Sequence, residues 1–153
     1  MQNWFECKIK YEKTVEEGKI ATVSESYLVD ALSFNEAENR IIEEMKPFIS
    51  GEFNISSVRR VRIQEMIQNQ NGDKWYRCKV NFISLDEESA VEKILSVAMY
   101  VQADSFINAH HNLVERLKNS LSDYVIASIT ETAIMDVYNY VPENQNPASE
   151  TVN

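Results

Sequence analysis

The chain contains the same sequence pattern twice, and this internal repeat constrains the fold more than any other feature. Residues 3–13 read NWFECKIKYEK and residues 74–82 read KWYRCKVNF. Matched positions lie 71 or 72 residues apart through most of the chain. Self-similarity at one period indicates that one supersecondary unit is used twice. We therefore predict a first repeat over residues 3–67 and a second over residues 74–138.

Each repeat opens with alternating apolar and polar residues, which is the pattern of a half-buried strand. The predicted inward positions are Phe5, Cys7, Ile9 and Tyr11, then Tyr76, Cys78, Val80 and Phe82. The predicted outward positions are Trp4, Glu6, Lys8 and Lys10, then Trp75, Arg77, Lys79 and Asn81. A second strand follows a polar turn and alternates most clearly at residues 27–31 and 99–103. Each repeat is thus predicted to begin with two strands.

A helix is predicted after the second strand of each repeat. Ser33 and Ser105 are the expected N-caps, because a hydroxyl can accept a hydrogen bond from a free amide of the first turn. Glu36 would complete a capping box with Ser33, and Asn108 offers a weaker version with Ser105. Apolar residues then recur at helical spacing. They are Phe34, Ala37, Ile41, Ile42 and Met45, then Phe106, Ala109, Leu113, Val114 and Leu117.

The third strand of each repeat has a less regular pattern. Its apolar positions are Ile55, Val58, Val61 and Ile63, matched by Ile126, Ile129, Thr132 and Ile134. A step of three within a period of two indicates a bulge, here near Arg59 and Thr130. A short helical segment is the alternative, because SVRRVRIQEMI also fits helical spacing. The Asn-Gly within residues 68–74 favours a hairpin into the first strand of the second repeat.

These elements give each repeat the order ββαβ. One such unit is marginal alone, whereas two can bury their helices against a shared sheet. We predict an α+β fold of tandem duplicated ββαβ units, with both helices packed on one face of antiparallel sheet, as a single pseudo-twofold domain over residues 1–139. One continuous sheet and two packed sheets both fit the pattern. Residues 140–153 are polar, contain two prolines and are predicted to form a disordered tail.

Several segments resemble a known family. They are NWFECKIKYEKT, YLVDALSFNEAENRIIEEM, FISGEF, KWYRCKV and ETAIMDVY. These residues are similar to an uncharacterised family of small bacterial (Bacteroides-type) and phage proteins, known only as a domain of unknown function. The resemblance covers nearly the whole chain before the predicted tail. It implies a bacterial or phage cytoplasmic protein and transfers no activity, cofactor or catalytic residue.

The charge and hydropathy of the chain narrow its possible partners. A formal net charge of −9 argues against a protein that coats duplex DNA or anionic membrane with its whole surface. A local basic patch remains compatible with that charge. No apolar run is long enough for a transmembrane helix, and the first residues lack the pattern of a secretory signal. We expect a cytoplasmic protein without a membrane partner.

The two cysteines, Cys7 and Cys78, occupy the same place in the two repeats. Their spacing contains no CxxC motif, so a metal or redox site is not indicated. Small buried apolar side chains on a strand are the predicted role. A disulfide between the two, or a redox role, is the alternative.

The sequence offers no set of residues suited to catalysis. The motifs GxGxxG, GxxxxGK[ST], GxSxG and HExxH are absent, and three glycines leave no glycine-rich phosphate loop. His110 and His111 are adjacent on a helix and point about 100° apart. His111 and Glu115 share a helix face, but two ligands do not make a metal site. We predict no enzyme, no metal and no cofactor.

The outward face of the first strands is the strongest candidate for binding, because it combines cations with tryptophan. The candidate residues are Trp4, Lys8, Lys10, Arg60, Arg62, Trp75, Arg77 and Lys79. Across the predicted hairpin, Arg62 would lie beside Lys79. Single-stranded nucleic acid is bound by cations that follow its backbone and by aromatic rings that stack on its bases. We therefore predict a non-enzymatic protein that binds single-stranded nucleic acid through this face.

The same face supports a second hypothesis, a protein–protein interaction or homo-oligomeric adaptor module. Exposed Trp4 and Trp75 would then anchor the partner, since aromatic residues and arginine dominate interface energetics. A purely structural explanation also exists, because the open face of an antiparallel sheet is usually polar. The second repeat offers Glu131 and Ala133 where the first offers arginines, which weakens the basic pattern.

Overall fold

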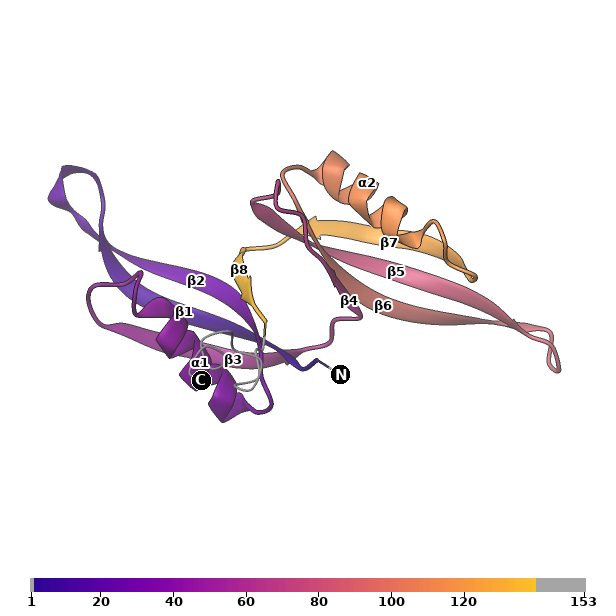
Figure 1. Cartoon of the computed structure of the whole chain (residues 1–153), viewed down its shortest axis with the longest axis horizontal. Helices are drawn as coiled ribbons and strands as arrows, with labels where there is room; N and C mark the ends of the chain where they lie inside the picture. Colours follow the sequence, from indigo (N-terminus) through magenta and orange to yellow (C-terminus); the bar gives the residue numbers. More distant parts are fainter. Residues whose placement is uncertain (1, 140–153) are drawn as a thin grey trace, which may run out of the picture. The chain divides into compact units, whose positions relative to one another are not determined.

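The computed structural model describes residues 2–139, in which eight strands form two four-stranded sheets accompanied by two helices (Figure 1). The chain divides into two compact units. Unit 1 comprises the chain up to Val61 together with the segment from Asp136, and unit 2 comprises Arg62–Met135. The predicted α+β class is confirmed, and the strands form two sheets rather than one. The tail predicted at residues 140–153 lies outside the described residues.

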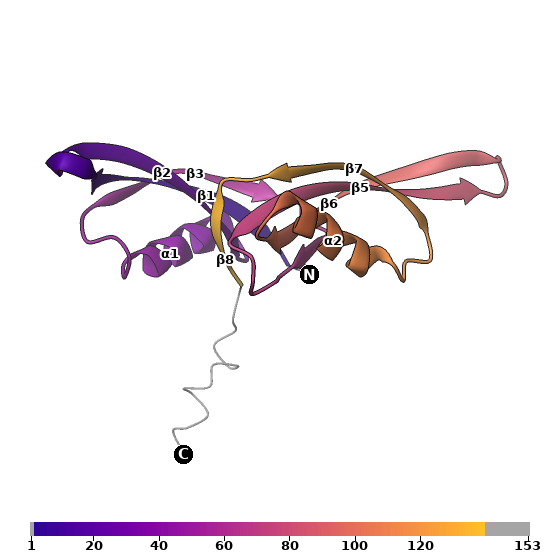
Figure 2. The same cartoon turned by 90° about the horizontal axis from the view of Figure 1, so that it is seen from above.

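The sheet of unit 1 has the strand order β3-β1-β2-β8. Its strands are β1 (Trp4–Thr14), β2 (Ile20–Asp30), β3 (Phe53–Val61) and β8 (Ile134–Tyr138). The short 3-10 turn η1 (Glu16–Gly18) joins β1 to β2, which are antiparallel. Helix α1 (Phe34–Met45) covers one face of this sheet (Figure 2).

The sheet of unit 2 has the strand order β4-β6-β5-β7. Its strands are β4 (Glu65–Ile67), β5 (Lys74–Asp86), β6 (Val91–Ala103) and β7 (Asp123–Glu131). Strands β5 and β6 are antiparallel, β7 is antiparallel to β5, and β4 runs parallel to β6. Helix α2 (Phe106–Leu117) covers one face, as α1 does in unit 1.

Both helices begin at the predicted caps. The Ser33 hydroxyl accepts a hydrogen bond from the Glu36 amide at 3.1 Å, and the Ser105 hydroxyl accepts one from the Asn108 amide at 3.2 Å. Each helix then buries three residues spaced four apart, which places them on one face. They are Ala37, Ile41 and Met45 in α1, and Ala109, Leu113 and Leu117 in α2. This regular spacing explains why the helices were predictable from sequence.

The predicted role of the cysteines is confirmed. Cys7 and Cys78 are free thiols with no exposed surface, and each belongs to the apolar core beneath its own helix. Burial raises the pKa of the Cys7 thiol to about 12, and the nearby Glu38 and Glu6 carboxylates add to that rise. Burial alone raises the pKa of the Cys78 thiol to about 11. Both side chains therefore act as small apolar core residues.

The predicted hairpin between the third strand and the second half is wrong. Strand β3 pairs with β1, and the neighbours of β5 are β6 and β7. After β3 the chain instead forms β4, which joins the sheet of unit 2 beside β6. The last strand, β8, joins the sheet of unit 1 in turn. Each sheet thus takes its short edge strand from the other half of the sequence.

The predicted bulges exist in both halves but lie three residues earlier than expected. The β1–β3 register shifts between Lys8 and Ile9, which leaves Ser56 without an opposite residue. The β5–β7 register shifts between Lys79 and Val80, which leaves Ala127 without an opposite residue. The helical alternative for the third strand is wrong, since β3 and β7 are both extended.

Candidate binding surfaces

The two tryptophans are buried, so the prediction that they stand exposed is wrong. Trp4 has 2% and Trp75 has 3% of its surface accessible. Within unit 1, Trp4 lies opposite Asp30 of β2 and Val61 of β3. Such side chains can neither stack on a base nor anchor a partner in this conformation. The sequence alternation correctly placed them on the face away from the helix but carried no information about what covers it.

Unit 1 presents two exposed lysines farther along the same face as Trp4. Lys8 lies opposite Ser26 and Ser57, and Lys10 lies opposite Ser24 and Asn54. No carboxylate therefore occupies a position directly across from either lysine. Burial decreases along β1 from Trp4 to the exposed Lys8 and Lys10.

Unit 2 presents a corresponding pair, the exposed Arg77 and Lys79, on the face that carries Trp75. Arg77 lies opposite Tyr100 of β6 and Thr130 of β7. Lys79 lies opposite Ala98 and Ser128. Four of the eight predicted site residues are thus exposed cations on tryptophan-bearing faces, two in each unit.

Arg60 lies on a different face from the one predicted. It is opposite Phe5, whose side chain packs in the core beneath α1, so Arg60 points to the helix side of the sheet. Its guanidinium donates a hydrogen bond to Asn3 Oδ1 at 2.8 Å. Arg59 occupies the tryptophan-bearing face instead and forms an ion pair with Glu6. The reason is the bulge at Ser56, after which simple alternation places residues 58 and 60 inward.

Arg62 does not pair with Lys79 as the predicted hairpin required. It is exposed and lies between β3 and β4, outside both strands. Strand β6 separates β4 from β5 in the sheet order. The predicted cluster is thus divided, with Lys8 and Lys10 in unit 1, and Arg62, Arg77 and Lys79 in unit 2.

Sequence reasoning missed one exposed feature of unit 2, the far end of its β5–β6 hairpin. Strand β7 pairs with β5 only as far as Ile83, and β4 pairs with β6 only at Met99–Val101. Beyond these points β5 and β6 form a two-stranded ribbon (Figure 1). We call residues 82–95 the β5–β6 arm; it comprises this ribbon and, at its base, Phe82 and Ile83, which still pair with β7.

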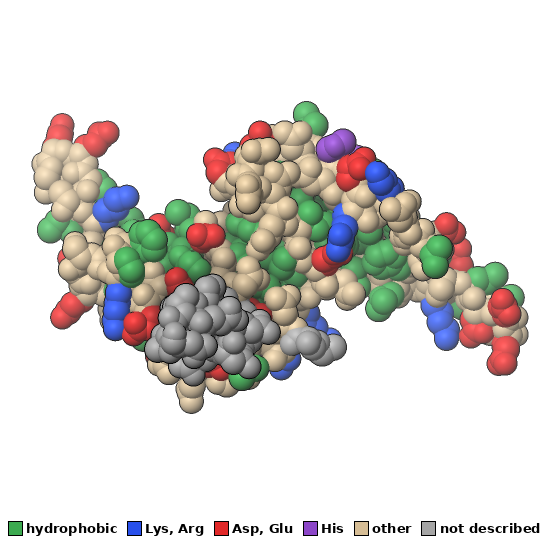
Figure 3. Space-filling model, viewed as in Figure 1, with side chains coloured by type: hydrophobic (Ala, Val, Ile, Leu, Met, Phe, Trp, Pro, Cys, Tyr) green, Lys and Arg blue, Asp and Glu red, His purple; other side chains and the backbone are tan. Residues whose placement is uncertain are grey.

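The β5–β6 arm exposes apolar side chains on both faces. Leu85, Val91, Ile94 and Leu95 each have 56–64% of their surface accessible. The register places Ile94 opposite Ile83 on the face that carries Trp75. It places Leu95 opposite Phe82 on the face that carries α2. Figure 3 shows hydrophobic side chains beside acidic ones at the end of this hairpin.

The turn of the β5–β6 arm is acidic and is closed by internal hydrogen bonds. The Asp86 carboxylate accepts a hydrogen bond from the Glu88 amide at 3.0 Å, and the Asp86 carbonyl accepts one from the Ala90 amide at 2.8 Å. The Glu88 amide is the main cause of the lowered pKa of Asp86. Lys93 Nζ lies 3.5 Å from Asp86 Oδ2. Glu87 and Glu92 add two further exposed carboxylates to the end of the arm.

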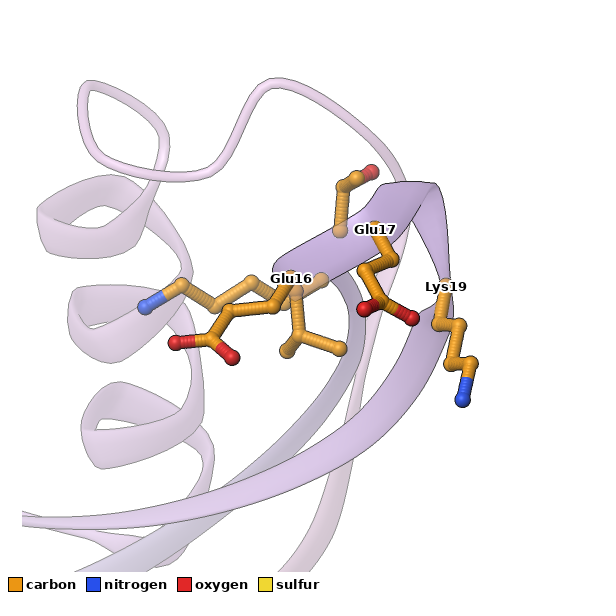
Figure 4. Close-up of a pocket in the computed structure, with 6 residues that line it drawn as sticks. Glu16, Glu17 and Lys19 are labelled. Carbon is orange, nitrogen blue, oxygen red and sulfur yellow. The ribbon is translucent and has the colours of Figure 1, made fainter.

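The β1–β2 hairpin of unit 1 ends in a polar tip with a shallow hollow of about 610 Å³. Figure 4 shows Glu16, Glu17 and Lys19 spreading from the turn rather than converging on one point. The Val15 amide donates to the Lys19 carbonyl at 2.7 Å and closes the turn. An open hollow lined by diverging charged side chains offers no preorganised catalytic geometry.

One comparison with known families covers most of the chain. The model of a domain of unknown function, DUF4494, matches residues 3–140. The chain belongs to the DUF4494 family. The match confirms the resemblance to an uncharacterised domain family, and its description names no activity. No curated protein matches the chain.

Two further features of this DUF4494 domain concern metals and membranes. His110 and His111 are exposed on α2, and residues 2–139 contain no group of three His, Cys, Asp or Glu side chains placed to hold a metal ion. Neither α1 nor α2, the helices of that described range, is long and apolar enough to cross a bilayer.

Proposed function

We propose that this DUF4494 protein is a non-enzymatic protein-binding module and that the β5–β6 arm is its binding element. The observation that carries the proposal is the exposure of apolar side chains on both faces of a ribbon that extends past its sheet. Isolated two-stranded ribbons are marginally stable in water. A partner that covers Leu85, Ile94 and Leu95 would remove apolar surface from water, at about 25 cal/mol per Å² buried.

The non-enzymatic part of the proposal rests on the location of the strongly perturbed groups. In functional sites, displaced pKa values mark polar groups that converge on a cleft. Here the pKa values of Cys7 and Cys78 are raised by burial in the apolar cores, and burial likewise raises the pKa of Tyr138 to about 12. These shifts accompany packing and need no catalytic explanation.

The proposal is tested by using the protein as bait in extracts of its native host and quantifying captured proteins by mass spectrometry. The arm variant combines Leu85→Thr with Leu95→Thr, and the control is Ile20→Thr, an equally exposed apolar residue in the other hairpin. We expect the arm variant to lose a partner that wild type and control both retain. Equal recovery with all three baits would contradict the proposal.

A second candidate function is binding of single-stranded nucleic acid through Lys8, Lys10, Arg77 and Lys79. Their exposure supports it, whereas the burial of Trp4 and Trp75 removes the stacking rings. Fluorescence anisotropy of a labelled oligonucleotide tests it directly. Binding should weaken steeply with salt and should be lost when Lys8 and Lys10, or Arg77 and Lys79, become glutamate. Affinity unchanged by these charge reversals would refute this candidate.

We further propose that the chain arose by tandem duplication of one ββαβ unit. The matched sequence offset, the equivalent N-caps and the equivalent bulge positions support this history. From the sequence, we also propose a bacterial or phage origin and a cytoplasmic location.

A further inference from the structure

We infer that the partner of the β5–β6 arm is a second copy of this chain, joined by antiparallel pairing of the free edges of two β6 strands. This inference rests on the proposed function and names its partner. The paired segment is Val91–Val97, and the two-fold axis of the dimer passes beside Ile94.

The first argument is that this segment has an open edge. Strand β5 pairs with β6 along one side from Val91 to Ala103. On the other side β4 begins only at Glu65, which lies opposite Met99, and the Gln64 amide donates to the Ala98 carbonyl at 2.8 Å. Within residues 2–139, the strand pairing therefore leaves seven consecutive residues of β6, Val91–Val97, without a neighbour on that side. A row of unpaired backbone groups is a template for another strand.

The second argument concerns the shape of the occupant. Ile94 lies on the face that carries Trp75, whereas Val91, Leu95 and Val97 lie on the face that carries α2. A helix docked on the ribbon could cover only one face. An added strand continues the sheet and places its own side chains next to both sets. Apolar exposure on both faces therefore favours an extended partner.

The third argument is the register, because a two-fold axis perpendicular to the sheet requires one residue to lie opposite itself. Centring on Glu92 or Lys93 would oppose like charges, which destabilises a strand pair. Centring on Leu95 would bring Val91 opposite Met99, which β4 already occupies. Only Ile94 is both the midpoint of the free edge and free of these conflicts.

The register centred on Ile94 also brings compatible side chains together. Ile94 faces Ile94 of the second copy, and Val91 faces Val97. Glu92 faces Ser96, whose hydroxyl can donate to a carboxylate, and Lys93 faces Leu95. No two like charges lie opposite each other, so the edge is self-complementary, as an isologous interface requires.

Disulfide trapping tests this register. Opposite residues of an antiparallel pair have Cα atoms about 4.5–5.5 Å apart, which is within the range of a disulfide. Ile94→Cys should therefore form a covalent dimer under mild oxidation, seen on a non-reducing gel. Cys7 and Cys78 have no exposed surface and will not compete. Glu92→Cys and Ser96→Cys should each fail to cross-link alone but should cross-link when the two variants are mixed.

The control is Thr22→Cys, an exposed position at the matching place in β2 of unit 1. Ile94 is 61% exposed, so its replacement should not unfold the chain, which circular dichroism will verify. Analytical ultracentrifugation of wild type should show a monomer–dimer equilibrium. Ile94→Glu would oppose two carboxylates and should weaken dimerisation at least about tenfold. Cross-linking of Ile94→Cys no greater than that of Thr22→Cys would overturn the inference.

The outcomes separate this inference from the proposed function. A monomeric wild type whose arm captures a different protein would overturn the dimer and leave the protein-binding arm standing. Loss of both self-association and any arm-dependent partner would overturn both proposals. A dimer whose cross-links follow the Ile94 register supports both.

Discussion

The two long hairpins of this protein have similar backbones and different surfaces. Near its tip the β1–β2 hairpin exposes two apolar residues, Val15 and Ile20, among the charged Lys13, Glu16, Glu17 and Lys19, whereas the β5–β6 arm exposes four, Leu85, Val91, Ile94 and Leu95. The cores beneath the helices differ much less. Ala37 and Ala109 are both fully buried, as are Ile41 and Leu113. In both units the core residues must pack against the apolar face of a helix, so they resemble each other. The hairpin ends have no such constraint, and a specific activity is therefore best sought at the hairpin ends.

The largest expected effects would come from the shared cores. Ile41→Ala and Leu113→Ala each remove a fully buried side chain and should lower the free energy of unfolding by about 2–5 kcal/mol. Urea denaturation followed by circular dichroism measures both. Similar losses would show that the two cores are energetically equivalent. A loss below about 1 kcal/mol in only one variant would show that the resemblance does not extend to energetics.

The helix caps should show a smaller effect of the same kind. Ser33→Ala and Ser105→Ala each remove one side-chain acceptor for a first-turn amide and should cost about 1 kcal/mol. Thermal denaturation compares the two variants directly. Serine-to-threonine replacements at the same sites are the controls and should retain most of the stability. Alanine variants as stable as wild type would mean that water replaces the hydroxyl at no cost.

The buried thiols predict a dependence of stability on alkaline pH. Because the folded protein raises both cysteine pKa values above the ordinary 9.0, it holds these protons more tightly than the unfolded chain does. The associated stability is complete below pH 9 and is lost as pH rises through about 11 for Cys78 and about 12 for Cys7. Denaturation midpoints measured between pH 8 and 11 should fall with increasing pH.

Residue periodicity and capping residues predicted the elements of this fold whose formation depends on neighbouring residues. Two strands, a serine cap and a helix with a buried stripe could be identified in each half because each has its own periodicity. The sheet to which β4 and β8 belong could not be predicted. The three-residue strand Glu65–Ile67 is too short to show a period, and its Glu65 pairs with Met99, 34 residues along the chain. Strand pairing at that distance depends on the whole fold rather than on neighbouring residues.

The candidate site was harder to predict than the fold, for two physical reasons. A bulge at Ser56 instead of near Arg59 changes which later residues point inward, and that error moved Arg60 to the wrong face. Alternation also assigns a residue to a face without saying whether that face is covered, which is why Trp4 was expected in solvent. The exposed cations Lys8, Lys10, Arg77 and Lys79 were placed correctly because strands β1 and β5 alternate without interruption.

The smallest expected effect on stability belongs to the β5–β6 arm and is the most informative about function. Leu85→Thr with Leu95→Thr replaces two exposed side chains by a residue with good strand propensity, so the free energy of unfolding of the monomer should change by less than about 0.5 kcal/mol. Urea titration at low protein concentration, where association is negligible, measures this change. A core substitution that weakened binding to the same extent would do so by unfolding the protein. The two arm substitutions would weaken binding by changing the surface alone. A destabilisation comparable to that of Leu113→Ala would mean that the arm packs as part of the fold, and its apolar residues would then need no partner.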